Sequence, residues 1–280
     1  MANILLSAFS DEYAAPFKEQ LCAMRELGIH HIEVRGIDGK NVSELTDDER
    51  LTAKQLLDEY GIRVSAIGSP IGKISLDGDM DAHLAMARRV FETAKLFDTR
   101  LVRVFSFYPP EGKDIGEMKE AVLTAMARLI ALAKDYGIIL CHENEARIFG
   151  DTPARIRILL DHFGGDLRCV YDMGNYVLEG VDPLAAYPDF KKDIAYFHIK
   201  DALYAGAIVP PGTGEAKIKE ILSLHKDYAS EDFFVSLEPH LECFSGLHKL
   251  VGRSFENPYK YETPEAAFTD AVQKFKELLA

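Results

Sequence analysis

The chain has 280 residues, of which 32 are Lys or Arg and 45 are Asp or Glu, so its formal net charge is −13. This charge opposes binding to a nucleic-acid backbone or to an anionic membrane surface. No segment approaches the roughly 20 continuous apolar residues that span a bilayer. The first residues, MANILLSAFSDEY, carry no cationic leader, and we therefore expect a cytoplasmic protein of one domain.

Cysteine usage excludes two further classes. The four cysteines are Cys22, Cys141, Cys169 and Cys243, and no two of them form a C-x-x-C pair. This spacing argues against a disulfide framework and against a zinc ribbon. We expect each cysteine to act as a small buried apolar side chain.

The same pattern recurs along the chain: a short β-rich run, a polar loop and a longer segment with apolar residues at helical spacing. The predicted strands are Ile4–Phe9, His31–Arg35, Arg63–Ile67, Leu101–Phe107, Ile138–His142, Leu167–Asp172, Ile194–Ile199 and Phe233–Glu238. The predicted helices lie near residues 14–27, 46–60, 79–97, 114–136, 152–163, 182–191, 215–229 and 263–279. This alternation predicts parallel strands joined by right-handed crossovers.

Several predicted helices have recognisable ends. Gly61 and Gly137 each follow a helical run and precede a strand, where glycine can close the helix in a left-handed conformation. Thr152 and Thr263 each precede a proline, which places an N-cap and a favoured first helical residue in the right order.

Eight strand–helix units are the number that closes a barrel. An open doubly wound sheet is the main competitor, but it would usually carry a glycine-rich loop after the first strand, and LLSAFSDEY has none. We therefore predict an α/β fold with a single (β/α)8 TIM barrel over residues 1–280.

Active sites of such barrels form at the carboxyl ends of the strands. Four successive predicted strands, the fifth to the eighth, end in the strings CHENE, YDMGN, FHIKD and SLEPH. These strings bring Glu143, Asp172, His198 and Glu238 toward one point. Two glutamates, an aspartate and an imidazole form an oxygen and nitrogen ligand set suited to Mn²⁺, Mg²⁺, Co²⁺ or Zn²⁺.

The strings HENE, YDMGN, FHIKDA, VPPGTGE and SLEPHL, supported by SPIGK and FSDE, carry a family resemblance. The chain resembles the sugar phosphate isomerase/epimerase family of xylose isomerase-like barrels over essentially its full length. This family includes ketose 3-epimerases, inosose dehydratases and repair nucleases of the endonuclease IV type.

The resemblance implies one divalent metal ion bound by Glu143, Asp172, His198 and Glu238. It also implies a sugar isomerase or epimerase that works by proton transfer through a metal-stabilised enediolate. Glu143 and Glu238 are the expected catalytic residues, because carboxylates on opposite sides of the substrate carbon can remove a proton and return one.

The sequence does not identify the substrate. Ketose epimerases of the family have a histidine shortly after the strand-six aspartate and an arginine after strand seven, where this chain reads DMGNY and DALYAGAIVPPG. Lys73 and Arg35 place cations at other strand ends, where they could hold a phosphate or a carboxylate. The remaining candidates for substrate binding are Asn175, Lys200 and His240. Small-molecule sugars and sugar phosphates are the expected partners, with no nucleic acid and no membrane.

Three other functions stay open. A lyase, such as a sugar or inosose-type dehydratase, would use the same enediolate with a leaving hydroxyl. An endonuclease IV-like nuclease would need more histidines at the metal site and a basic surface for DNA. A non-catalytic sugar-binding barrel would not need two carboxylates on opposite faces of the substrate.

Two details also stay open. The long aromatic segment CFSGLHKLVGRSFENPYKYET, residues 243–263, could pack over the site or against a second subunit, so a homo-oligomer is an open alternative. Side chains alternate along a strand, so Glu143 and Glu145 share one direction and His142 takes the other. Alternation does not say which direction is inward, and the family resemblance selects Glu143.

Overall fold

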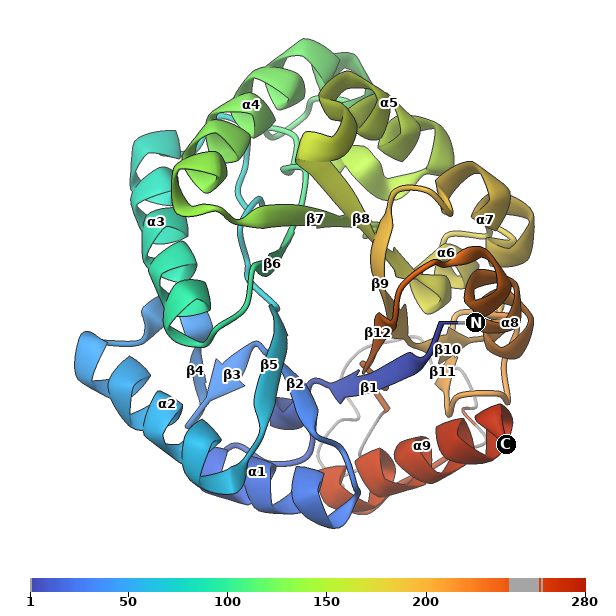
Figure 1. Cartoon of the computed structure of the whole chain (residues 1–280). Helices are drawn as coiled ribbons and strands as arrows, with labels where there is room; N and C mark the ends of the chain where they lie inside the picture. Colours follow the sequence, from blue (N-terminus) through green and yellow to red (C-terminus); the bar gives the residue numbers. More distant parts are fainter. Residues whose placement is uncertain (1, 242–256, 258) are drawn as a thin grey trace.

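The computed structural model describes residues 2–241, 257 and 259–280. Eight parallel strands form a ring, and helices surround it (Figure 1). The strands are β1 (Ile4–Ala8), β2 (His31–Val34), β5 (Arg63–Ile67), β6 (Leu101–Val104), β7 (Ile139–Glu143), β8 (Leu167–Asp172), β9 (Ile194–Ile199) and β12 (Phe233–Leu237). The predicted TIM barrel is confirmed, and the expectation of one domain over residues 1–280 stays a prediction.

The ring is nearly closed. The hydrogen-bonded order is β1-β12-β9-β8-β7-β6-β5-β2, so the first and the last strand of the described residues are neighbours. They pair in register from Ile4 opposite Phe233 to Ala8 opposite Leu237. Parallel pairing brings all the carboxyl ends of the strands to one rim of the barrel, as the sequence predicts.

The helices cover the outside of the ring. They are α1 (Phe17–Glu26), α2 (Asp47–Tyr60), α3 (Met80–Leu96), α4 (Lys119–Tyr136), α5 (Pro153–Phe163), α6 (Met173–Leu178), α7 (Pro183–Phe190), α8 (Ile218–Tyr228) and α9 (Pro264–Leu279). Short 3-10 helices lie at η1 (Ser10–Glu12), η2 (Val42–Glu44), η3 (Ile115–Met118), η4 (Phe149–Asp151) and η5 (Gly164–Asp166). Two small hairpins, β3 (Gly36–Ile37) with β4 (Lys40–Asn41) and β10 (Asp201–Ala202) with β11 (Ile208–Val209), lie outside the ring of eight strands.

The predicted helix ends are confirmed. Gly61 and Gly137 adopt φ values of 63° and 68° after α2 and α4, in the left-handed region that glycine tolerates. The side chains of Thr152 and Thr263 accept hydrogen bonds from backbone N–H groups in the first turns of α5 and α9. Sequence chemistry therefore places these ends correctly.

Several strand ends, those of β1, β2, β7 and β12, differ from the prediction by one residue, and two elements near the site differ more. Strand β6 ends at Val104 instead of Phe107, because the backbone N–H groups of Phe105, Phe107 and Tyr108 donate to carbonyls of the loop after β5. A short helix, α6, begins immediately after Asp172, where we expected only one later helix in this unit. Both departures lie at the rim that carries the candidate site.

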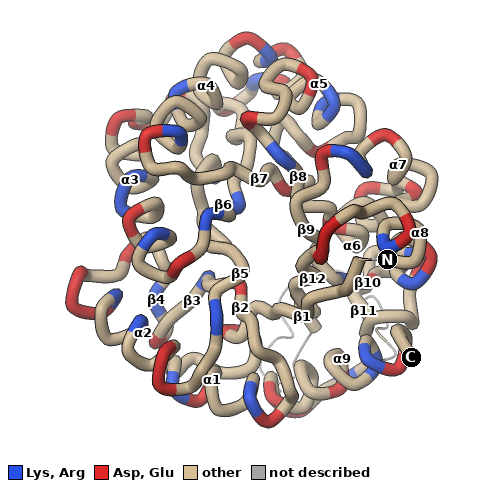
Figure 2. Tube along the Cα trace, in the orientation of Figure 1, with Lys and Arg blue, Asp and Glu red and all other residues tan. Residues whose placement is uncertain are grey.

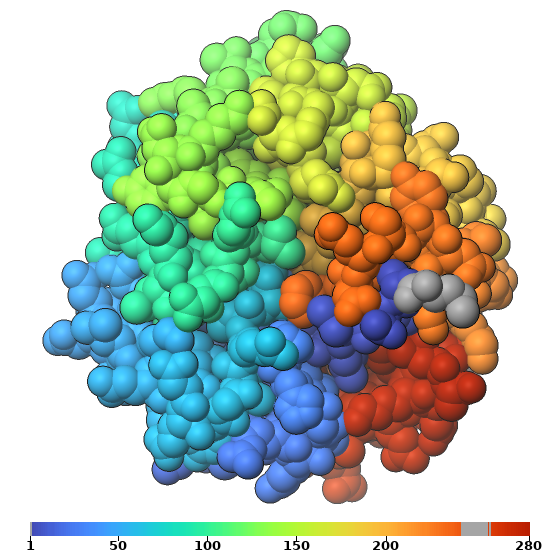
Figure 3. All heavy atoms as spheres, viewed as in Figure 1, coloured from blue at the N-terminus to red at the C-terminus, as the bar shows by residue number. Residues whose placement is uncertain are grey.

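The main hydrophobic core lies between the strands and the helices, and a smaller cluster lies inside the ring. The inner cluster consists of Ala66, Cys141, Val170 and Tyr196. Figure 3 shows that heavy atoms close most of the centre that looks open in the ribbon. Charged residues of both signs are distributed over the surrounding helices (Figure 2).

Of the predicted buried cysteines, Cys141 and Cys169 are buried free thiols, Cys22 is partly exposed and free, and Cys243 lies outside the described residues. Most of the aromatic segment 243–263 also lies outside them. Among the described residues, every helix is too short or too polar to span a bilayer.

Candidate active site

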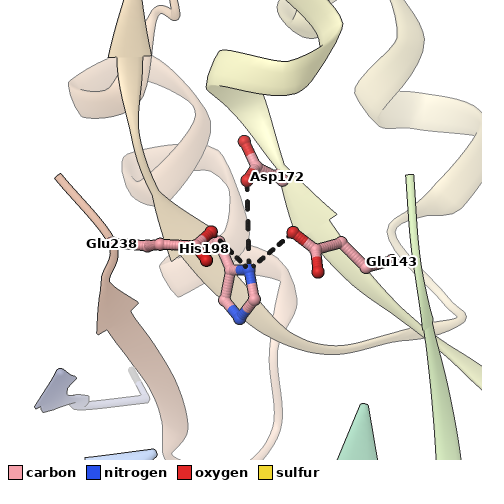
Figure 4. A group of neighbouring side chains, drawn as sticks. All are labelled: Glu143, Asp172, His198 and Glu238. Atoms are coloured by element: carbon pink, nitrogen blue, oxygen red, sulfur yellow. Dashed lines mark hydrogen bonds and ion pairs between the residues drawn. The ribbon is translucent and has the colours of Figure 1, made fainter. Parts of the chain in front are cut away.

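Strand ends bring the four predicted metal ligands together. Glu143 is the last residue of β7, Asp172 is the last of β8, His198 lies near the end of β9, and Glu238 follows β12 directly. Asp172 and His198 are cross-strand partners. One ligand atom from each of the four lies within 4.8 Å of the others, and all four side chains are buried (Figure 4).

His198 is the centre of this group. Its Nδ1 lies 3.0 Å from Oε1 of Glu143, 3.3 Å from Oε2 of Glu238 and 3.9 Å from Oδ2 of Asp172. Burial alone would lower the pKa of His198, but attraction to the carboxylates around it outweighs burial and raises that pKa well above its usual range. The three carboxylates therefore converge on one nitrogen of the imidazole.

The other imidazole nitrogen is held by Glu33, at the end of β2. Nε2 of His198 lies 3.0 Å from Oε2 of Glu33, and the hydroxyl of Tyr196 donates to Oε1 of Glu33 at 2.9 Å. Glu33 is fully buried. A carboxylate behind a histidine fixes the ring orientation and leaves the opposite nitrogen free to bind a metal.

Asp172 is fixed on both sides. Its Oδ1 accepts a hydrogen bond from the backbone N–H of Asn175, which makes Asp172 the N-cap of α6. Its Oδ2 accepts a hydrogen bond from Nζ of Lys200 at 2.9 Å. Burial raises the pKa of Asp172 to about 7, and the Lys200 ammonium opposes this rise.

Asn144 fixes the main chain next to Asp172. Its side-chain amide donates to the carbonyl of Asp172 at 2.9 Å and accepts from the N–H of Asp172 at 3.0 Å. The amide of Asn175 donates to the carbonyl of Asn144 at 2.8 Å. These bonds tie the ends of β7 and β8 to the start of α6.

Three cations surround Glu238. Nζ of Lys200 lies 3.0 Å from Oε2, while Nη1 of Arg35 and Nη1 of Arg103 lie 3.1 and 3.5 Å from Oε1. Burial would raise the pKa of Glu238, but attraction to Lys200 and to nearby histidines lowers that pKa well below its usual range. Glu238 is therefore held as an ionised carboxylate.

Glu143 has a different set of neighbours. Its Oε1 faces His198, and its Oε2 lies 3.2 Å from Nη1 of Arg103. Burial would raise the pKa of Glu143, but His198 and Arg103 together lower it to about 2. Cys141, two residues earlier, points into the barrel, so Glu143 does so as well.

The donor set fits a divalent cation. Oε2 of Glu143 and Oε2 of Glu238 are buried and accept no hydrogen bond from the described residues. Around His198 lie four carboxylates, those of Glu33 and the three acidic candidate ligands, and two permanent cations, Lys200 and Arg103. Arg35, the third cation near Glu238, is shared with Asp11 and Glu12, so a divalent ion that took the place of the proton on Nδ1 of His198 would still lie among more carboxylates than cations.

The five predicted substrate-binding residues fall into three places. Lys200 and Asn175 lie in the centre, where Nζ of Lys200 donates to Oδ1 of Asn175 at 3.1 Å. Arg35 contacts Glu238 but also pairs with Asp11 at 2.8 Å and Glu12 at 3.2 Å, while His240 lies at the mouth, 3.2 Å from Arg35. Lys73 lies further out, 3.2 Å from Oε2 of Glu145 and 4.3 Å above the ring of Phe105.

The residues of CHENE that surround Glu143 take separate places. Nε2 of His142 lies 2.9 Å from the hydroxyl of Ser106, and His142 packs against the backbone of Gly150, away from the four-residue group. Glu145 pairs with Lys73. Neither side chain joins the candidate metal ligands.

Asp201, the neighbour of Lys200, holds the loop PPGTGE. Its carboxylate accepts backbone hydrogen bonds from Gly212, Gly214 and Ala216 at 2.8, 2.9 and 3.0 Å. This loop is therefore anchored to the end of β9 rather than left as an open phosphate-binding turn.

Two cavities open near the centre. One, of about 490 Å³, is lined by Glu12, Ile208, Pro239, His240, Leu241, Pro264, Ala267 and Phe268. The other, of about 500 Å³, is lined by Lys73, Tyr108, Glu145, Ala146 and Arg147. Both lie at the rim formed by the carboxyl ends of the strands.

Sequence reasoning missed two buried charged residues of the site, Glu33 and Arg103. Each lies in a short apolar strand, in the strings HIEV and LVRVF. A charge inside such a strand is the signal that could have identified them, because a charged side chain is almost never fully buried unless it is paired.

Comparisons with known proteins agree with this architecture. A family model described as "Xylose isomerase-like TIM barrel" matches residues 21–277, while no curated protein sequence matches the chain. Among solved structures, the chain is similar to 3-keto-D-glucoside 4-epimerase YcjR from E. coli, with a TM-score of 0.71, 15% identity and coverage of 99% of this chain and 100% of that chain.

Two further solved structures are similar. The probable 3-DHS dehydratase AsbF from Bacillus anthracis has a TM-score of 0.69 and 19% identity, and the match covers 85% of this chain and 92% of that chain. A xylose isomerase-like TIM barrel protein from Mycobacterium smegmatis in complex with magnesium has a TM-score of 0.70 and 16% identity, with coverage of 100% and 98%. At these identities the likenesses establish the fold alone. The family match extends over most of the sequence, and the chain belongs to the xylose isomerase-like TIM barrel family.

Proposed function

We propose that this chain is a divalent-metal-dependent isomerase or epimerase that acts on a sugar or sugar phosphate by proton transfer. One observation carries the proposal. Two ionised glutamates, Glu143 and Glu238, approach the same nitrogen of His198 from opposite sides (Figure 4). In each glutamate Oε2 is buried and lies in an ion pair, with Arg103 for Glu143 and with Lys200 for Glu238, but it accepts no well-aligned hydrogen bond from the described residues.

Glu143, Asp172, Nδ1 of His198 and Glu238 would hold the ion. Such an ion acts as a Lewis acid that polarises the carbonyl of an open-chain sugar and makes the neighbouring C–H more acidic. Glu33 keeps Nδ1 of His198 directed at this position. Mn²⁺, Mg²⁺, Co²⁺ and Zn²⁺ all suit the oxygen and nitrogen donors.

The two glutamates would carry the protons. One carboxylate removes the proton from the carbon next to the carbonyl, and the C–H electron pair moves into a C=C bond while the carbonyl pair moves onto oxygen. The other carboxylate, once protonated, delivers a proton to the opposite face of the same carbon. This sequence inverts the centre, and delivery to the neighbouring carbon would give isomerisation instead.

We assign the substrate contacts to Lys73, Arg35, Asn175, Lys200 and His240. Lys200 and Asn175 are in the centre and would contact hydroxyl groups near the reacting carbon. Lys73 lies beside the cavity with Tyr108 and Arg147, where its ammonium would hold a distal phosphate or carboxylate. A small sugar derivative is the expected partner.

Solvent-deuterium exchange tests the proposal. The purified protein is incubated with Mn²⁺ and a panel of ketoses, aldoses, sugar acids and their phosphates in deuterium oxide, and exchange at the carbon next to the carbonyl is followed by NMR. We expect exchange with at least one substrate, and its loss in Glu143→Gln and Glu238→Gln. An absence of exchange across the panel with a fully metal-loaded protein would contradict the proposal.

A lyase reaction is the second candidate. Lys200 supports it, because its buried ammonium contacts both Asp172 and Glu238 and could hydrogen-bond to a leaving hydroxyl. A neighbour in fold is named a probable dehydratase. The two reactions differ in their product, since a lyase releases water and gives a product with one more double bond, which mass spectrometry detects as the loss of water.

A further inference from the structure

Arg103 is a charged residue inside the barrel. It lies in β6, and only 6% of its surface is exposed. Its guanidinium carbon lies 5.1 Å from the ring centre of Phe9 and 5.0 Å from that of Phe105, so two aromatic rings lie near it. These contacts and its burial fix the guanidinium in place.

Its donors are only partly used. Nη2 donates to the carbonyl of Gly68 at 3.1 Å, while Nη1 lies 3.2 Å from Oε2 of Glu143 and 3.5 Å from Oε1 of Glu238. Nε is buried and donates no hydrogen bond within the described part of the chain. Buried N–H groups nearly always have a partner, and this one belongs to a side chain that contacts both candidate catalytic glutamates, where a bound ligand could supply the acceptor.

Metal binding does not explain the presence of Arg103. A permanent positive charge within 3.2 Å of a candidate ligand oxygen repels a divalent cation at the same position. Arginine also stays protonated at every accessible pH, so it neither accepts nor delivers the proton of the reaction. What a fixed guanidinium can supply is a hydrogen bond to negative charge that develops during the reaction.

We propose that Arg103 is a catalytic residue that donates a hydrogen bond to the substrate oxygen that becomes negative when a glutamate removes the proton. This inference rests on the proposed proton-transfer function. The abstracted proton moves to the carboxylate, the carbonyl electron pair moves to oxygen, and Arg103 keeps all its protons. Its contact with both glutamates places it beside the reacting carbon whichever glutamate acts first.

The test uses oxalate, a planar dianion whose adjacent oxygens resemble those of an enediolate. Wild type, Arg103→Met, Arg103→Lys and the control Arg50→Met are loaded with Mn²⁺, and Mn²⁺ and oxalate affinities are measured by calorimetry. Arg50 is a matched control because it is a buried arginine with an unpartnered Nε that pairs with Asp47 and Glu92 on the outer helices.

In Arg103→Met we expect Mn²⁺ binding at least as tight as in wild type and oxalate binding weakened at least tenfold. The rate of deuterium exchange should fall 10²- to 10³-fold through kcat, the usual effect of removing one donor to a developing oxyanion. Arg103→Lys keeps the charge, so its oxalate affinity and exchange rate should lie between those of wild type and Arg103→Met. Arg50→Met should lose stability but keep both affinities.

Three results would overturn the inference: no oxalate binding by wild type, equal oxalate affinity in wild type and Arg103→Met, or loss of Mn²⁺ binding together with oxalate binding. The last result would mean that Arg103 only positions the carboxylates. If Arg103→Met does not fold, the same comparison is made with Arg103→Lys. Arg103-dependent oxalate binding without sugar exchange in wild type would count against the proposed sugar chemistry and not against the role of Arg103.

Discussion

Oε2 of Glu33 lies 3.0 Å from Nε2 of His198, on the side of the imidazole that faces away from the three other carboxylates. This hydrogen bond joins β2 to β9 across the barrel, between residues that are 165 positions apart in the sequence. In the proposed metal site it favours Nδ1 rather than Nε2 as the ligand atom, because one ring nitrogen can serve Glu33 while the other serves the metal.

Replacing Glu33 tests this orientation. We expect Glu33→Gln to weaken Mn²⁺ binding about 10- to 100-fold, the usual effect of removing the carboxylate behind a metal-binding histidine. Tyr196→Phe, which removes only the hydroxyl bound to Glu33, should have a smaller effect. Calorimetric titration with Mn²⁺ measures both, and an unchanged affinity in Glu33→Gln would show that Glu33 does not orient the ligand.

Glu238→Gln tests the proton-transfer role. The amide keeps the shape of the carboxylate but cannot carry the proton, so deuterium exchange should slow by about 10²- to 10⁴-fold. Glu120→Gln is the control, because Glu120 is an exposed glutamate at the start of α4, outside the four-residue group and both cavities. A deuterium-exchange rate in Glu238→Gln within a few-fold of the wild-type rate would show that Glu238 does not transfer the proton.

Lys73→Gln tests the outer cation. If Lys73 holds a distal anion, KM for a phosphorylated or carboxylated substrate should rise about tenfold, which corresponds to about 1.4 kcal/mol, and KM for the neutral analogue should not change. Lys113→Gln, at an exposed position after β6, is the control. Equal effects on charged and neutral substrates would mean that Lys73 only pairs with Glu145.

His225 predicts a pH dependence of stability away from the site. Burial, with a smaller contribution from Arg168, lowers the pKa of His225 to about 4, and its ring lies edge-on to Phe197 and Phe233. Since a histidine in the unfolded chain has a pKa near 6.5, the unfolded state binds more protons between these values. The free energy of unfolding should therefore fall as the pH falls from about 6.5 to about 4.

His225→Phe keeps the aromatic packing and removes the titration. Its free energy of unfolding should be lower at pH 7, because the hydrogen bond with the hydroxyl of Tyr187 is lost. The fall toward pH 4 should be less steep than in wild type, by up to about 1.4 kcal/mol per pH unit. Urea denaturation at several pH values measures the slope, and parallel slopes would contradict the assignment.

The fold could be predicted from the sequence because strand and helix patterns alternate clearly. Arg63–Ile67, Leu167–Asp172 and Ile194–Ile199 have the predicted bounds, since each is an apolar or β-branched run with a clear loop after it. The end of β6 could not be predicted, because three of the residues 105–108 are aromatic, as in a continuing strand, and they leave the sheet only to pair with the loop after β5. That partner lies in another unit.

The candidate ligands could be predicted from strand ends and family strings, but their surroundings could not. Glu33 and Arg103 join the site through contacts between strands that are distant in the sequence. No local spacing indicates which residues they contact. EVRG indicates a cation at a strand end but not its partners, and the structure pairs Arg35 with Asp11, Glu12 and Glu238. Charge partners of this kind depend on the closure of the barrel.

The metal content of the purified protein is the most direct test of the central claim, that Glu143, Asp172, His198 and Glu238 form one divalent-metal site. Wild type and Asp172→Ala are dialysed against Mn²⁺, freed of unbound metal and analysed by plasma mass spectrometry, with circular dichroism to check the fold. The account predicts about one ion per chain in wild type and far less than one in folded Asp172→Ala. A stoichiometric ion in Asp172→Ala, or none in wild type, would contradict it.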